Sequence, residues 1–157
     1  MNSSELEKTV AKIAGLRLDE VWCACEMLMF RFAQYSLHAQ CPTRIVGKGD
    51  ILLTTLDYQS WDEKTDSNND EWYNLERYKP DIVGGKVLSV KINPLFDLTI
   101  GLDNGVVIQC FVGNGYAHYG EEREQYRFFE IGPDGETEEE EKLRKHYVVY
   151  SKHTEIR

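Results

Sequence analysis

The chain of 157 residues carries a formal net charge of −9 at pH 7, and 41% of its residues are hydrophobic and 11% aromatic. This composition is typical of a soluble globular protein and excludes a disordered chain, and the length suits one domain, residues 1–157, with a substantial core. The negative charge repels nucleic acid phosphates and anionic lipids, so we expect neither nucleic acid nor membrane as a partner.

The N-terminal segment and the cysteines predict the cellular compartment of the protein. The segment MNSSELEKTV has neither a basic start nor an apolar core, so no secretory signal is predicted. The four cysteines are too few and too irregularly spaced for the disulfide framework of a small secreted protein. We therefore expect a cytoplasmic protein with reduced thiols and no cofactor.

The first predicted element is a helix over residues 2–14. Asn2 and Glu5 form a possible capping box, and Gly15 can provide the C-terminal stop. Alternation typical of strands follows from residue 16 to about residue 46, with short interruptions. The next segment, residues 61–74, is polar and acidic, which predicts a long loop.

A comparison of the two halves predicts an internal repeat. With an offset of 69 residues, interrupted by a slip of one residue over residues 27–32, apolar positions fall on apolar positions at period two, as a half-buried antiparallel sheet requires. We therefore expect a sheet-dominated α+β fold with two units, about residues 2–46 and 72–112, each a helix followed by a three-stranded antiparallel meander. Matched pairs include Leu6 with Leu75, Ile13 with Ile82, Gly15 with Gly84, Leu18 with Val87, Val21 with Val90, Cys23 with Ile92, Leu37 with Val106, Ala39 with Ile108 and Cys41 with Cys110.

The second unit contains the clearest hairpin signal. In LTIGLDNGVVIQCFV, two apolar runs flank Asp103, Asn104 and Gly105, a combination that favours a tight turn. Residues 113–157 then predict a pair of C-terminal strands and an acidic segment. Residues 121–141 hold ten Asp and Glu side chains against two arginines.

The best candidate for a metal site is Cys23, Cys25, His38 and Cys41. Thiolates and an imidazole suit zinc, and the first two thiols, two residues apart on a strand, would face the same way. The repeat favours a different interpretation, because Cys23 matches an isoleucine and Cys41 matches another cysteine, so both would fill core positions. We therefore predict no metal.

Histidine catalysis is the best alternative to a binding function. Four histidines are present, but the chain lacks a Gly-x-Ser-x-Gly elbow or a Cys/His signature that would supply a nucleophile. His38 with a nearby carboxylate, in a pocket between the two sheet units, would serve a small-molecule-binding or hydrolytic protein. We predict no catalytic residue.

Aromatic rings within acidic loops favour a protein-binding surface. Large amphipathic rings are good anchors at interfaces, and carboxylates would surround them; the alternative is that the rings only pin the loops onto the sheet. The predicted partner-binding residues are Trp61, Asp62, Glu63, Asp66, Asp70, Glu71, Trp72, Tyr116, Glu121, Glu122 and Glu124.

Two stretches carry a resemblance to a known family. SLHAQCPTRI, residues 36–45, and DLTIGLDNGVVIQCFV, residues 97–112, resemble an ALHxQCPWRI-like strand and a DLxLxLxNG hairpin of small uncharacterised bacterial proteins. The resemblance covers roughly residues 12–130, and Thr43 stands where that pattern has tryptophan. More loosely, the chain is similar to immunity proteins of bacterial toxin systems such as contact-dependent growth inhibition.

Together, these features predict a non-enzymatic protein that binds another protein. The resemblance implies an immunity protein that neutralises a cognate toxin, and the acidic surface would be steered onto a basic, nuclease-like toxin domain and cover its active site. The alternatives are the small-molecule-binding or hydrolytic protein above and a homodimer formed through an exposed strand edge.

Overall fold

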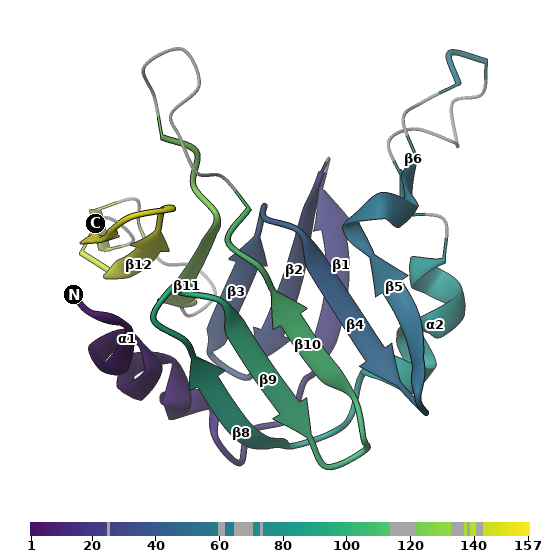
Figure 1. Cartoon of the computed structure of the whole chain (residues 1–157), viewed down its shortest axis with the longest axis horizontal. Coiled ribbons are helices and arrows are strands. Elements are labelled where there is room, and N and C mark those ends of the chain that lie inside the picture. Colours follow the sequence, from purple (N-terminus) through teal and green to yellow (C-terminus); the bar gives the residue numbers. More distant parts are fainter. Residues whose placement is uncertain are drawn as a thin grey trace.

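The computed structural model is dominated by antiparallel sheet, as the sequence predicts (Figure 1). It describes residues 1–24, 26–59, 62–64, 71–72, 74–113, 122–132, 137, 139–140 and 143–157. The helices are α1 (Ser3–Val10) and α2 (Leu75–Ile82), with 3-10 turns η1 (Ala11–Ile13) and η2 (Thr55–Asp57). The strands are β1 (Glu20–Ala24), β2 (Met27–Phe32), β3 (Tyr35–Ala39), β4 (Thr43–Gly47), β5 (Asp50–Thr54), β6 (Tyr58–Gln59), β7 (Glu71–Trp72), β8 (Val87–Ile92), β9 (Leu98–Leu102), β10 (Val107–Cys110), β11 (Tyr126–Glu130), β12 (His146–Val149) and β13 (Thr154–Ile156).

The predicted first helix is present and capped as expected. The side chain of Asn2 accepts a hydrogen bond from the Glu5 backbone at 3.0 Å, and the Glu5 carboxylate accepts one from the Asn2 backbone at 3.0 Å. This capping box satisfies two of the helix's free N–H groups. α1 buries Leu6 and Val10, and a 3-10 turn follows it before the chain reaches Gly15, whose φ of +79° suits glycine.

Each predicted unit forms a helix followed by a three-stranded antiparallel meander. In the first, β1 pairs with β2 and β2 with β3; in the second, β8 pairs with β9 and β9 with β10. The hairpin between β9 and β10 turns at the predicted Asp-Asn-Gly, where Gly105 has a φ of +82°. The strands of the second meander therefore lie where the sequence places them.

The sequence does not predict that each meander takes its next strands from the other half of the chain. β4 follows β3 in the chain but pairs with β10, and β11 follows β10 but pairs with β3. The two sheets therefore have the orders β1-β2-β3-β11-β12-β13 and β5-β4-β10-β9-β8. This exchange ties both halves into one core.

The third strands of the two meanders, β3 and β10, do not align with each other as the predicted repeat aligns them. Ile108 pairs with Ile100, and Leu37 pairs with Phe30 in the equivalent row, so Leu37 corresponds to Ile108 and not to Val106. The reason is loop length, since two residues separate β2 from β3 while the second unit's turn is longer. The shift of two residues keeps the same face inward, which is why the apolar match survives.

The two segments that precede the meanders bond to one another reciprocally. Gly15 N–H donates to the Val87 carbonyl at 2.9 Å, and Gly84 N–H donates to the Leu18 carbonyl at 2.8 Å. Both glycines have positive φ. Two further bonds run from Leu18 N–H to Gly85 O at 2.9 Å and from Val87 N–H to Leu16 O at 2.8 Å, around a bridge that pairs Arg17 with Lys86.

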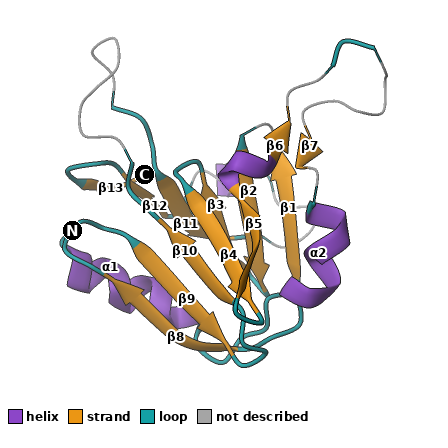
Figure 2. Ribbon diagram, turned by 45° about the vertical axis from the view of Figure 1, so that its right-hand side comes forward, coloured by secondary structure: helices purple, strands orange, loops and turns teal. Residues whose placement is uncertain are grey.

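The core lies between the sheets, and the helices lie at opposite edges of it (Figure 2). α1 packs mainly on β8, while α2 contacts β1, β4 and β5 and so touches both sheets. Phe30, Phe32, Tyr126 and Phe128 are among the largest fully buried side chains, all from the six-stranded sheet. Within the described ranges, neither helix has the length and apolar character needed to cross a bilayer.

Candidate functional site

The predicted partner-binding residues fall on two segments, and the structure describes part of each. Trp61, Asp66, Asp70, Tyr116 and Glu121 lie outside the described residues. The described roots of both segments, β6 with β7 and residues 122–125, lie at the same end of the two sheets (Figures 1 and 2). Residues far apart in the sequence are therefore brought to one end of the molecule.

Asp62 and Glu63 are exposed. Glu63 has a positive φ of 60°, and Asp62 Oδ1 accepts a hydrogen bond from the Lys64 backbone at 3.0 Å. Glu71 lies in the short strand β7, opposite Gln59 of β6. Asp62 and Glu63 are both exposed, and their predicted role in partner binding stays a prediction.

Trp72 has the alternative role that the sequence left open. Its side chain is only 3% exposed, and its ring meets Tyr58 edge-on, with centroids 5.8 Å apart. The two residues lie opposite one another in the hairpin that connects β5 to α2. The predicted anchor role is therefore wrong for Trp72, because a buried ring pins the loop to the core and cannot also enter a partner's pocket.

Glu122 and Glu124 are both engaged inside the molecule. The Glu124 carboxylate binds the Arg127 guanidinium through both oxygens, and the two side chains are 11% and 31% exposed. This contact raises the pKa of Arg127, because the hydrogen bonds from Glu124 favour the charged guanidinium. Glu122 Oε2 lies 3.1 Å from His153 Nδ1. The two carboxylates therefore contribute more to the structure of this surface than to its unpaired negative charge.

The most distinctive surface lies beside them, on the outer face of the six-stranded sheet. In β-strands alternate side chains share a face, and the pairing aligns Trp22, Met29, His38 and Arg127 in one row across β1, β2, β3 and β11. The same pairing puts Phe129 opposite Ser36 and His146 in the adjacent row. We call Trp22, His38, Arg127, Phe129 and His146 the outer cluster.

The four rings of the outer cluster form a continuous row in which each ring contacts the next. His38 meets Trp22 edge-on at 6.2 Å between centroids and Phe129 edge-on at 4.8 Å, and Phe129 stacks on His146 at 4.4 Å with an interplanar angle of 4°. All four ring side chains are half-buried. The result is a preorganised surface of aromatic and imidazole rings, which could bind another protein with little loss of side-chain entropy.

His38 is neutral at physiological pH. The pKa of this imidazole is lowered from 6.5 to about 4, mainly by burial and then by Arg127 and His146, while Glu124 acts in the opposite direction. Of the charged side chains around it, Arg127 and Glu124 are already bound to each other. His38 lies on the outer face, so its side chain does not face the space between the sheets where the alternative function would use it.

A hollow of about 320 Å³ continues the outer face toward the end where the two loop roots lie. It is lined by Ala24, Glu26, Met27 and Gln40. Ala24 and Met27 pair directly, one step along the strands from Trp22 and Met29, so they share their face. The outer cluster therefore has a concave, partly acidic neighbour into which a partner side chain could fit.

The predicted metal ligands are divided between two sides of the sheet. Cys23 pairs with Leu28 on the inner side, His38 faces outward, and Cys41 is buried in the core beside Cys110; Cys25 lies outside the described residues. A hydrogen bond with Cys41 and burial raise the pKa of Cys110 well above its usual value, so this thiol stays protonated. Within the described ranges, no group of three His, Cys, Asp or Glu side chains is placed to hold a metal ion.

Comparisons with protein families, curated proteins and solved structures gave no match. The sequence reasoning did not identify the outer cluster, although a signal exists: Trp22, Met29 and His38 all occupy the positions that alternate with the buried residues of their strands.

Proposed function

We propose that this protein is a non-enzymatic inhibitor that binds another protein through the outer cluster. The observation that carries the proposal is the row of contacting rings on a sheet face, with the Arg127 guanidinium among them. Aromatic residues and arginine are enriched at the centres of protein interfaces and account for much of the binding energy. A rigid, half-buried set of rings is suited to that role.

The charge of the chain indicates the chemistry of the partner. A net charge of −9 attracts a basic protein over long range and raises its association rate. Exposed carboxylates of Glu20, Glu26, Asp62 and Glu63 lie on the outer face or on the loop beyond it. The partner in this proposal is a bacterial toxin with a basic, nuclease-like surface, and the inhibitor acts in the cytoplasm as an immunity protein.

The proposed duplication of one ancestral unit gives this surface an origin. The reciprocal bonds of Gly15 and Gly84, and the exchange of β4 and β11 between the sheets, support it because each feature is repeated in both halves. Under this proposal, one copy's outer face became specialised for binding while both inner faces kept the core.

The experiment first establishes whether the reading frame immediately upstream encodes the C-terminal end of a large secreted protein, and then measures binding to that C-terminal domain by calorimetry. Trp22→Ala and Phe129→Ala should each weaken binding by roughly tenfold to a hundredfold, the range of an interface hot spot. The matched control is Lys91→Ala, because Lys91 occupies in β8 the row position that Trp22 occupies in β1. We expect little effect from the control.

Salt provides a second measurement. If steering by the acidic surface contributes, the association rate should fall as ionic strength rises, since screening shortens the range of the charges. Equal weakening by Trp22→Ala and Lys91→Ala would contradict the outer cluster as the binding surface, and an association rate that is insensitive to salt would contradict a basic partner.

A further inference from the structure

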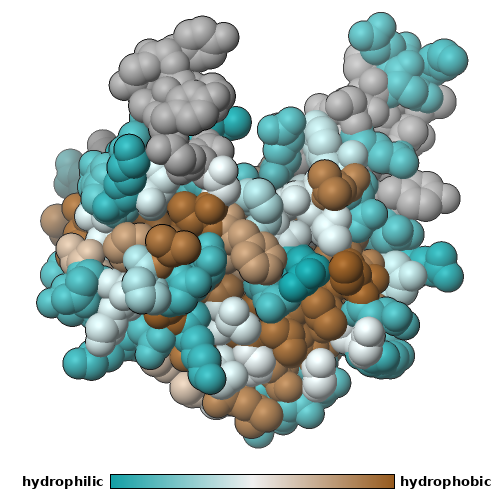
Figure 3. Space-filling model, viewed as in Figure 1, coloured by the Kyte–Doolittle hydropathy of each residue, from teal (hydrophilic) through white to brown (hydrophobic). Residues whose placement is uncertain are grey.

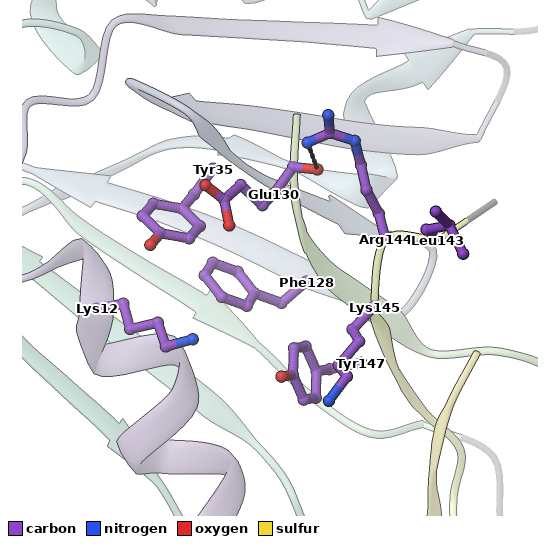
Figure 4. Close-up of a pocket in the computed structure, with 8 residues that line it drawn as sticks. All are labelled: Lys12, Tyr35, Phe128, Glu130, Leu143, Arg144, Lys145 and Tyr147. Atoms are coloured by element: carbon purple, nitrogen blue, oxygen red, sulfur yellow. Dashed lines mark hydrogen bonds between the residues drawn. The ribbon is translucent and has the colours of Figure 1, made fainter. Parts of the chain in front are cut away.

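A pocket of about 360 Å³ opens at the edge between the sheets, well apart from the outer cluster. It forms where the inner face of the six-stranded sheet continues past the core and η1 provides the opposite wall (Figure 4). The lining residues are Lys12, Tyr35, Phe128, Glu130, Leu143, Arg144, Lys145 and Tyr147. This volume is at the lower end of the range for sites that bind small molecules.

The floor of the pocket is aromatic. Tyr35 stacks on Phe128 with centroids 5.4 Å apart and an interplanar angle of 15°. Phe128 pairs directly with Tyr147 across β11 and β12, so the three rings share the inner face. Phe128 is buried, whereas the two tyrosines are half-buried and line the pocket. Such a floor favours a flat ligand.

The rim is basic in an otherwise acidic protein. Three of the eight lining residues, Lys12, Arg144 and Lys145, are cationic, and only Glu130 is anionic. Arg144 donates a hydrogen bond to the Glu130 carbonyl at 3.4 Å, which holds it at the rim. In a chain with 18 basic and 27 acidic residues, this local excess of positive charge favours an anionic ligand.

Glu130 and Lys145 lie toward opposite ends of the floor, with Arg144 on the Glu130 side. In Figure 4 the Glu130 carboxylate lies beside Tyr35, the Lys145 side chain lies beside Tyr147, and Phe128 lies between them. The pairing explains the order, because Glu130 is opposite Tyr35 in β3 and β11. A matching ligand is flat, with an anionic group at one end and hydrogen-bond donors at the other.

We propose that this pocket binds a guanosine monophosphate or a closely similar purine nucleotide. The base would lie along the rings, its N–H and amino groups would donate to Glu130, and the phosphate would lie between Lys12 and Lys145. Guanine suits the carboxylate because it presents two adjacent donors, while adenine presents an acceptor beside its amino group. The site is independent of the proposed inhibitor function, because its residues face inward and the outer cluster faces outward.

The first test is calorimetric titration of the full chain with guanosine 5′-monophosphate, adenosine 5′-monophosphate, guanosine and inorganic phosphate. Saturable binding of guanosine monophosphate is expected, with about tenfold weaker binding of each of the other three, since each lacks one of the matched groups. Absence of saturable binding at millimolar concentration would overturn the proposal. Equal binding of phosphate alone would reduce the pocket to a non-selective anion site and would also overturn it.

Substitutions then test which end of the pocket binds the phosphate and which end binds the base. The double substitution Lys12→Gln with Lys145→Gln should weaken nucleotide binding by about tenfold or more and leave guanosine unchanged. Glu130→Gln should lower the preference for guanine over adenine. All three side chains are exposed, so the variants should fold, which a thermal melt verifies. Lys91→Gln, on β8, is the matched control, and an equal loss in this control would contradict the assignment.

Discussion

The two meanders share an inner face and differ in their outer faces. On the inner side, the row Val21, Phe30 and Leu37 corresponds to Val90, Ile100 and Ile108. On the outer side, the row Trp22, Met29, His38 and Arg127 corresponds to Lys91, Thr99, Gln109 and Arg44. The inner residues stay apolar, whereas only the arginine is common to the two outer rows.

The arginines show how a shared residue acquires different surroundings. Arg127 is held by Glu124 beside His38, whereas Arg44 donates two hydrogen bonds to Gln109, at 2.9 and 2.7 Å, and lies over the Phe111 ring at 5.4 Å. Figure 3 shows the outer face of the five-stranded sheet, where hydrophobic and hydrophilic residues are interspersed. Packing in the shared core constrains both inner faces, whereas the outer faces differ, and the ring-rich outer face is the candidate for function.

The largest expected effect tests the equivalence of the inner faces. Phe30 and Ile100 are both 0% exposed and occupy the same row of their meanders. Phe30→Ala should lower the free energy of unfolding by about 3–5 kcal/mol and Ile100→Ala by about 2–5 kcal/mol, because each leaves a cavity in one shared core. Urea denaturation monitored by circular dichroism measures both.

The control for this pair is Thr99→Ala, which lies next to Ile100 in β9 but on the outer face of the sheet. It should change stability by less than about 1 kcal/mol, since little apolar surface is lost there. If the first meander tolerated Phe30→Ala while the second collapsed with Ile100→Ala, the two inner faces would not be equivalent, and the duplication would lose its support.

A smaller effect is expected where the two segments that precede the meanders hydrogen-bond to each other. Gly15 and Gly84 have φ values of +79° and +96°, and an added Cβ would meet no atom within 4 Å at either site. Alanine at either position should therefore cost only the backbone strain of about 1–2 kcal/mol, and a similar amount in both halves. Thermal unfolding of the two variants side by side measures this, and a large inequality would show that the junction is not symmetric.

The sequence predicted local elements better than their assembly. The capping box of Asn2 and the Asp-Asn-Gly turn depend on adjacent residues, so both were visible in the sequence. The exchange of β4 and β11 was not, because periodicity shows which face of a strand is buried but not which strand it pairs with. Trp72 illustrates the same limit, since its burial depends on Tyr58 across a hairpin that spans a long polar loop.

The smallest expected effect is a difference in how the free energy of unfolding depends on pH, and it tests a difference between the two outer faces. His38→Gln introduces the residue that the second meander has in this row, Gln109. In the parent protein, burial and the neighbouring Arg127 lower the pKa of His38 from 6.5 to about 4, so the unfolded chain binds a proton that the folded chain does not between these values.

The sign follows from that difference in proton binding. Stability from this group is fully present above pH 6.5 and is lost as the pH falls toward 4. Between pH 7 and pH 5, the free energy of unfolding of the parent should therefore fall by about 1 kcal/mol more than that of His38→Gln, after allowance for the exposed part of the ring. The other histidines are common to both proteins, so their contributions cancel. Parallel curves for the two proteins in denaturant titrations at both pH values would show that the outer cluster does not hold His38 in a neutral state.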